Sequence, residues 1–202
     1  TLENMSKAVY SEESKRWRFV QTLDWTRSFG KHDLGALVGY EAIRNWGFNT
    51  DMAKQGAADA SLTDLSTYTE LSNITGTTWE NTSRSFFGRL TYAYKSRYLF
   101  EVNARYDGSS RFAPESRWGF FPSFSGGWRV SEESFMQGSP FDNLKIRLSW
   151  GKLGNNSIGD YEWQATYSGS NYIFGDKLTS GLAQTVIANQ KLRWESVTQT
   201  NI

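Results

Sequence analysis

A two-residue alternation of apolar and polar side chains over residues 98–156 constrains the fold of this chain more than any other feature. The segment 98–106 shows it well, because its apolar phase holds Tyr98, Phe100, Val102, Ala104 and Tyr106. An extended strand points alternate side chains to opposite faces, so this segment predicts a strand with one apolar and one mainly polar face. Aromatic residues at both ends of the apolar face are typical of a barrel wall that meets two water interfaces.

Composition excludes several other classes of protein. Mean hydropathy is −0.58 over 202 residues, and no apolar run approaches the roughly 20 residues that a membrane-spanning helix needs. Lys and Arg (22) nearly balance Asp and Glu (21), so the net charge of +1 gives no electrostatic argument for nucleic-acid binding. The absence of cysteine excludes disulfides, thiolate metal sites and a cysteine nucleophile.

The same alternation predicts further strands, joined by connections of unequal length. The expected strands cover residues 17–27, 34–46, 84–94, 98–106, 118–130 and 144–151, and a last one begins near Leu192. Short links are expected at 29–33, 95–97 and 131–143, and long loops at 47–81, 107–117 and 154–191. Tight turns at one end and long loops at the other are typical of outer-membrane barrels. The sequence therefore predicts an all-β fold: an antiparallel up-and-down transmembrane β-barrel segment, with about six to seven strands of a larger barrel.

Three local irregularities are also expected. We predict a helical turn near residues 51–60 and another in the link 131–143, capped by Ser131 with Glu132 and Glu133 in its first turn. Pro122 lies inside an expected strand and lacks a ladder N–H, so we predict a β-bulge near it.

Several ordered motifs resemble one family of membrane proteins. They are RYDGSSRFAPESRWGFFPSFSGGWRVSEESF (105–135), LKIRLSWGKLGNNSIGDY (144–161), KLRWESVTQTNI (191–202) and KHDLGALVGYEAIR (31–44). These runs resemble the barrel of SusC/RagA-type TonB-linked (TonB-dependent) outer-membrane transporters of Bacteroidetes. The segments 47–81 and 168–189 carry no such motif, as expected of substrate-specific loops.

The resemblance implies a fold, a location and partners. It implies a barrel of roughly 22 strands with an internal plug, of which residues 1–202 are a partial β-barrel domain, with the plug domain and the remaining strands absent. The N-terminal residues lack the features of a secretory signal, which fits a piece of a longer protein. In this family the barrel lies in the cell outer membrane in contact with lipid, TonB acts through the missing N-terminal region, a SusD-like surface lipoprotein caps the barrel, and the cargo is commonly an oligosaccharide or a peptide.

Candidate contact residues for cargo or for the lid protein lie in the expected external loops, and each has a structural alternative. The candidates are Trp46, Trp79, Asp107, Arg111, Asn155, Asn156, Trp163, Tyr167 and Tyr172. Asp107 and Arg111 face the lumen or plug on one interpretation and belong to ordinary turn chemistry on the other. Asn155 and Asn156 present amides to a sugar or tolerate the backbone conformations of a loop. The aromatic side chains stack on sugar rings, pack within loops or contact the lid protein.

The sequence favours no enzymatic activity, no cofactor and no metal site. His32 is the only histidine, with no partner for a metal pair or a triad, and surface solvation is the simpler interpretation. Glu132 and Glu133 are adjacent acids that diverge rather than flank a glycosidic bond. One alternative stays open: a soluble, secreted β-sandwich that binds carbohydrate, in which the apolar faces pack against each other.

Overall fold

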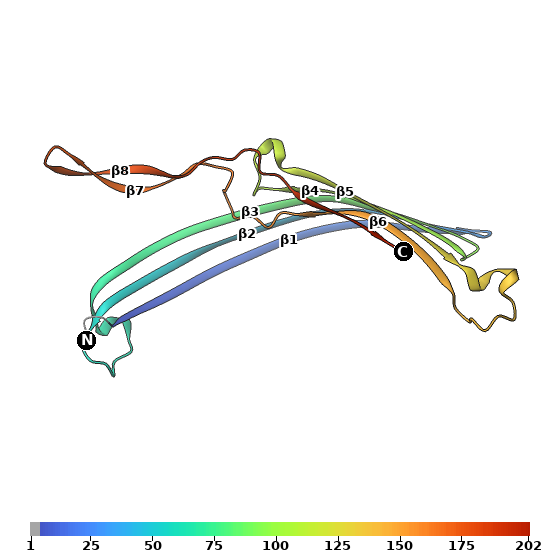
Figure 1. The fold of residues 1–202 in the computed structure, drawn as a ribbon, viewed down its shortest axis with the longest axis horizontal. Coiled ribbons are helices and arrows are strands. Elements are labelled where there is room, and N and C mark those ends of the chain that lie inside the picture. The colour runs from blue at the N-terminus through green and yellow to red at the C-terminus, as the bar shows by residue number, and fades with distance from the viewer. Residues whose placement is uncertain (1–4) are drawn as a thin grey trace. The chain divides into compact units, whose positions relative to one another are not determined.

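The computed structural model describes residues 5–202, which are mostly β-strand (Figure 1). The strands are β1 (Ser6–Phe29), β2 (His32–Ala57), β3 (Tyr68–Tyr94), β4 (Tyr98–Ser109), β5 (Trp118–Arg129), β6 (Lys145–Asn155), β7 (Thr166–Phe174), β8 (Lys177–Val186) and β9 (Glu195–Asn201). Short 3-10 turns are η2 (Leu65–Thr67), η3 (Pro114–Ser116), η4 (Val130–Glu132) and η5 (Ser134–Met136). Within the described residues, none of these helical turns has the length or apolar character to span a membrane.

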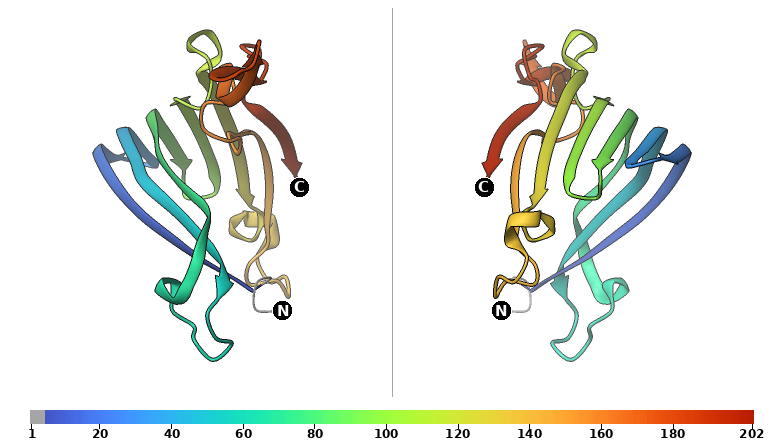
Figure 2. Two further views of the ribbon diagram at one scale, coloured as in Figure 1. Left: turned by 90° about the vertical axis from the view of Figure 1, so that its left-hand side faces the viewer. Right: turned by 90° about the vertical axis from the view of Figure 1, so that its right-hand side faces the viewer.

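The strands form an open sheet in chain order. Seven of them pair as β1-β2-β3-β4-β5-β6-β9, and β7 and β8 form a separate two-stranded sheet. Each pair from β3 to β6 is antiparallel, as is the pair of β6 and β9. Figure 2 shows β4, β5, β6 and β9 (green to dark red) in this order. The prediction of an all-β, antiparallel, up-and-down sheet with six to seven strands is therefore confirmed.

The chain divides into two compact units, and β1, β2 and β3 each contribute to both. The first unit comprises Thr1–Trp17 and Arg44–Asn81, and the second comprises Arg18–Ile43 and Thr82–Ile202. In the first unit, β2 and β3 are linked by polar side chains. Arg44 donates to both carboxylate oxygens of Glu80 at 3.0 and 2.9 Å, Asn45 donates to Asn81 at 2.8 Å, and Gln55 donates to Glu70 at 3.1 Å.

These polar pairs explain why the prediction of a long loop over 47–81 is wrong. β2 continues to Ala57 and β3 begins at Tyr68, so the connection shrinks to residues 58–67. The expected helical turn at 51–60 is extended strand through Ala57. Alternation fails here because both faces of these strands carry polar residues, and the paired backbone together with cross-strand polar pairs stabilises the structure instead.

In the second unit, the register places apolar residues of neighbouring strands side by side. Leu90 is opposite Val102, and Val102 is opposite Phe124, which is opposite Trp150. The intervening positions form the second face, where Glu101 is opposite Ser125. We call these two surfaces the apolar face and the polar face.

The apolar face is uncovered, which contradicts the β-sandwich alternative. Leu23 is 71% exposed, Leu90 60% and Phe100 54%. A sandwich buries such side chains against a second sheet, but the second sheet among residues 5–202 is only the β7–β8 hairpin, whose residues are all exposed. Within the second unit, the buried apolar side chains are instead Phe112, Ala113, Phe121 and Val130.

Three smaller predictions need correction. The expected loop at 154–191 contains the β7–β8 hairpin. Register between β4 and β5 passes through Ala104 and Pro122 without a bulge, and pairing with β6 begins one residue later at Ser123, so the missing N–H interrupts no ladder there. The link 131–143 holds two 3-10 turns, but Ser131 lies inside η4 and makes no side-chain cap.

Candidate functional site

Aromatic side chains form a continuous row across the end of the sheet that carries the short turns. We call it the turn-side row. Its neighbouring ring centroids are 4.9–6.5 Å apart in the order Phe29, His32, Tyr94, Tyr98, Trp128 and Phe135. Nδ1 of His32 also lies 2.8 Å from the Tyr92 hydroxyl. The prediction that His32 is a solvated surface residue is therefore wrong, because its ring is part of this row.

A second row, the loop-side row, crosses the same face nearer the loops. It runs through Phe19, Tyr40, Phe86, Trp118 and Tyr106, with centroids 4.8–6.5 Å apart. Tyr94 lies eight positions after Phe86 in β3, and Trp128 lies ten positions after Trp118 in β5. At about 3.3 Å per residue and a tilt of about 40°, the rows lie about 20–25 Å apart in height, which matches the apolar band of a membrane barrel.

The short turns are built by local chemistry. The Arg97 N–H donates to the Tyr94 carbonyl at 3.0 Å, and Lys95 and Ser96 both have positive φ (52° and 53°). Positive φ at both central residues is the requirement of a type I′ hairpin turn, whose twist matches the strands that it joins.

Glu133 fixes the next link to the turn-side row. Its carboxylate accepts hydrogen bonds from the Tyr98 hydroxyl (2.7 Å), the Trp128 indole N–H (3.1 Å) and Arg97 (3.1 Å). The bond from Tyr98 is the largest cause that holds the pKa of Glu133 below its usual value, followed by the bond from Trp128. An ionised Glu133 therefore stabilises this link.

The polar face of the second unit carries a charge network across four strands. Arg18 on β1 bonds Glu41 on β2 at 2.5 Å, and Arg105 on β4 lies 3.7 Å from the same carboxylate. Arg105 also pairs with Asp107 at 3.0 Å and lies over the ring of Phe87 on β3, 5.2 Å from its centroid. Two arginines and two carboxylates balance, so the network fixes the polar face without adding net charge.

At the loop end, the connection between β4 and β5 folds around a small aromatic core. Phe112 is fully buried, and its ring lies 5.3 Å from that of Trp194, which is 5.2 Å from Phe121. The Trp194 indole donates to the Arg117 carbonyl at 2.9 Å. The segment before β9 thereby holds a loop that is 77 residues away in sequence.

Two predicted site residues, Arg111 and Asn156, meet in this loop cluster. Arg111 pairs with Asp160 at 2.8 Å and also donates to the Asn156 carbonyl at 3.4 Å. The Asn156 amide donates to the Ser109 hydroxyl at 3.2 Å. Both side chains therefore fasten the β4–β5 loop to the segment after β6.

The other polar candidates lie in strands rather than in loops. Asp107 is in β4 and pairs with Arg105, while Asn155 ends β6 and donates to Glu195 at 2.9 Å. Gly108 also belongs to β4, and a Cβ there would meet the Trp118 ring at 2.8 Å, so the glycine serves close packing. The interpretation of Asp107 as part of a turn is therefore wrong. Gly154 also serves close packing, because a Cβ at this position would collide with the Phe121 ring.

The five aromatic candidates lie in three places. Trp46 and Trp79 lie in strands β2 and β3 of the first unit, where Arg44 lies over the Trp46 ring at 4.9 Å and the Trp79 indole donates to Asn49 at 3.2 Å. Trp163 is partly buried after β6, with an indole N–H that has no hydrogen-bond partner among the described residues. Tyr167 and Tyr172 lie on the β7–β8 hairpin and are 61% and 66% exposed.

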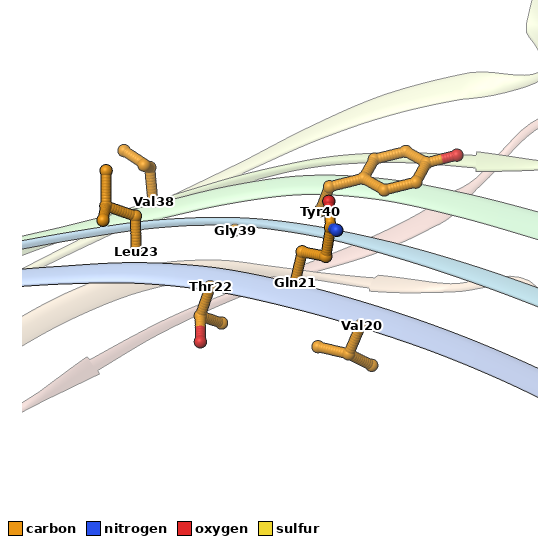
Figure 3. A pocket seen from close by; sticks show the side chains of 7 residues that line it. All are labelled: Val20, Gln21, Thr22, Leu23, Val38, Gly39 and Tyr40. Carbon is orange, nitrogen blue, oxygen red and sulfur yellow. The ribbon is translucent and has the colours of Figure 1, made fainter.

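A depression of about 620 Å³ lies along β1 and β2, but its lining does not converge on a ligand. Figure 3 shows Leu23, Val38 and Tyr40 on one side of the strands, with Val20 and Thr22 on the other. It is open surface around an edge strand rather than a binding cleft.

Sequence reasoning missed the partners that organise both the polar face and the loop cluster. Alternation places Glu41 and Arg105 on the polar face, but it cannot predict their contact, because the two residues lie on β2 and β4 with β3 between them. Phe112 was expected in a loop and Trp194 in the last strand, and nothing in the pattern indicated that their rings pack together.

Taken together, the open antiparallel sheet, the uncovered apolar face between two aromatic rows and the charged polar face define a segment of a transmembrane β-barrel wall. Residues 3–202 match the family model described as TonB dependent receptor-like, beta-barrel, and the chain belongs to this family.

The relatives agree with this assignment. The chain is 35% identical over 185 residues to the TonB-dependent receptor SusC of Bacteroides thetaiotaomicron, covering 89% of this chain and 18% of SusC. It is 33% identical to TonB-dependent receptor P3 of Formosa agariphila, again covering 89% of this chain and 18% of that receptor. A solved structure of the RagAB peptide transporter superposes with a TM-score of 0.81 at 30% identity, covering 96% of this chain and 22% of that one. The chain thus spans about a fifth of the relatives that it matches, all members of a class of receptors and transporters.

Proposed function

We propose that the chain is part of the barrel wall of a TonB-dependent nutrient importer in the outer membrane, and that it has no catalytic role. The observation that carries this proposal is the exposed apolar face between the turn-side and loop-side rows. In lipid, this surface needs no covering protein, while the polar face turns toward a plugged lumen. Residues 1–202 then form a partial barrel domain, and other parts of the protein supply the plug, the remaining strands and the contact with TonB.

The cargo we propose is an oligosaccharide or a peptide, taken up together with a SusD-like surface lipoprotein. One solved relative is described as the RagAB peptide transporter, which supports the peptide class, and the oligosaccharide class rests on the resemblance of the sequence motifs to the SusC/RagA family. Exposed Tyr167 and Tyr172, together with Trp46, Trp79 and Trp163, are our candidates for contact with cargo or with the lipoprotein. We assign Asp107, Arg111, Asn155 and Asn156 to shaping the loop end, because each is engaged by a neighbouring residue.

Uptake by the full-length protein tests this function. A strain that lacks the gene is supplied with defined oligosaccharides or peptides as its nutrient, and growth is compared with a complemented strain. We expect loss of growth on one cargo class only, restored by the gene, and co-purification of a surface lipoprotein with the tagged barrel. Equal growth on every substrate of both classes would contradict the importer, and a barrel that purifies without a lipoprotein would contradict the partner.

A further inference from the structure

A half-enclosed basic pocket lies on the apolar face beside the loop-side row. Its volume is about 330 Å³, and it is lined by Thr82, Ser83, Arg84, Gly108, Ser110, Arg117 and Trp118. Arg84 is opposite Gly108, and Gly108 is opposite Trp118, so these positions share the phase of Phe86 and Tyr106. The pocket therefore opens toward lipid, not toward the lumen.

Its depth along the strand matches the headgroup region of a bilayer. Trp118 belongs to the loop-side row and stacks on Tyr106 at 4.8 Å, and Arg84 is two residues beyond Phe86 on the loop side. Aromatic rows mark the boundary between hydrocarbon and headgroups, so a side chain just beyond such a row lies among the headgroups. Gly108 lets the Trp118 indole pack closely against β4 at the edge of the pocket, since a Cβ at this position would collide with the ring.

The lining chemistry suits a phosphate group. The pocket contains two arginines and three hydroxyl residues, and none of its lining residues, all within the described chain, is acidic. Nε of Arg117 is buried without a hydrogen-bond partner in the described part of the chain. A buried guanidinium N–H without an acceptor is unfavourable, and a phosphate oxygen is the acceptor that an arginine fork fits well.

We propose that Arg84 and Arg117 bind the phosphate of an anionic lipid headgroup on the lipid-facing side of the wall, with Trp118 packed against the lipid. This proposal rests on the membrane orientation of the proposed function. A lipid is favoured over a soluble anion because the pocket is continuous with the apolar face, which carries Phe86, Tyr106 and Phe120.

Native mass spectrometry of the full-length protein in detergent tests the pocket. The probes are phosphatidic acid, phosphatidylcholine and inorganic phosphate, added separately and in competition. The variants are Arg84→Gln/Arg117→Gln and a matched pair, Arg89→Gln/Arg147→Gln, which removes the same charge from the polar face. Because the assay measures lipid binding in detergent, its result does not depend on whether the protein imports any cargo.

We expect the wild-type protein and the polar-face pair to retain phosphatidic acid in preference to phosphatidylcholine. The Arg84/Arg117 pair should bind phosphatidic acid about tenfold more weakly, since charge-assisted hydrogen bonds are lost. Equal retention of both lipids by the wild type, or unchanged binding by the Arg84/Arg117 pair, would overturn the proposal. Complete displacement of phosphatidic acid by inorganic phosphate would show a soluble-anion site and overturn the assignment to lipid.

Discussion

The two ends of the strands in the second unit are stabilised in different ways. At the turn end, Lys95 and Ser96 form a tight reversal, and the pairing of neighbouring strands places Tyr94, Tyr98 and Trp128 in a row. At the loop end, Phe112 is buried against Trp194, and Arg111 pairs with Asp160 across 49 residues of sequence. A barrel wall therefore fixes its turn end through tight reversals and the pairing of adjacent strands, whereas its loops depend on a small core of their own.

Removal of that small core should give the largest effect. Phe112→Ala deletes a fully buried ring, and such changes cost about 3–5 kcal/mol. We expect the β4–β5 loop to open and become sensitive to protease in the full-length protein. The matched control is Phe120→Ala on the apolar face, where the ring is 55% exposed and no core is lost. Equal protease sensitivity of the two variants would remove the distinction between the loop core and the wall.

A charge on the apolar face between the two rows should be the next most disruptive change. Phe124 lies midway between Phe120 and Trp128. We expect Phe124→Arg to destabilise the barrel by about 2–4 kcal/mol, the cost of an arginine at the bilayer midplane. The neighbouring Ser125→Arg places the same charge on the polar face, opposite Glu101, and should be tolerated. Urea unfolding of the barrel in bilayers measures both. A larger loss for Ser125→Arg would mean that the faces are assigned in reverse.

The ion pair across the loops should matter less than the buried ring. Asp160→Asn removes the charge that Arg111 meets at 2.8 Å, and a hydrogen bond to a charged group contributes about 1.5–3 kcal/mol. We expect faster amide exchange in the β4–β5 loop and unchanged exchange in the turn 95–97. If both ends change together, the two ends are not independent.

The turn end should show the smallest effect, and it should depend on pH. The folded pKa of Glu133 is lowered chiefly by its bond from Tyr98. The stabilisation from ionised Glu133 is therefore present above the ordinary Glu pKa of about 4.3 and is lost as the pH falls through the lower folded value. Amide exchange in the link 131–143 should rise with acidification in the wild type, and Glu133→Gln should show a weaker dependence. Identical pH profiles would exclude Glu133 as the titrating group.

The sequence predicted the wall well because alternation is a local pattern. Leu144, Ile146, Leu148 and Trp150 fall in one phase, and the structure pairs β6 with β5 in that register. Alternation could not reveal the strands at 47–57 and 68–81, where polar pairs such as Gln55 with Glu70 replace an apolar face. Alternation is local and could not reveal the loop core either, because the burial of Phe112 depends on Trp194 at a distant position in the chain. Arg111 and Asn156 were singled out as residues, but their partners Asp160 and Ser109 follow only from the folded loops.

Spin labels placed one at a time along β4 of the full-length protein in bilayers report which face of the strand meets lipid. This chain has no cysteine, so its own residues add no background to labelling at positions 99–105. We predict high oxygen accessibility at positions 100, 102 and 104 and protection from oxygen at 101, 103 and 105. Accessibility that does not alternate, or that alternates in the opposite phase, would contradict a membrane wall with its apolar face in lipid.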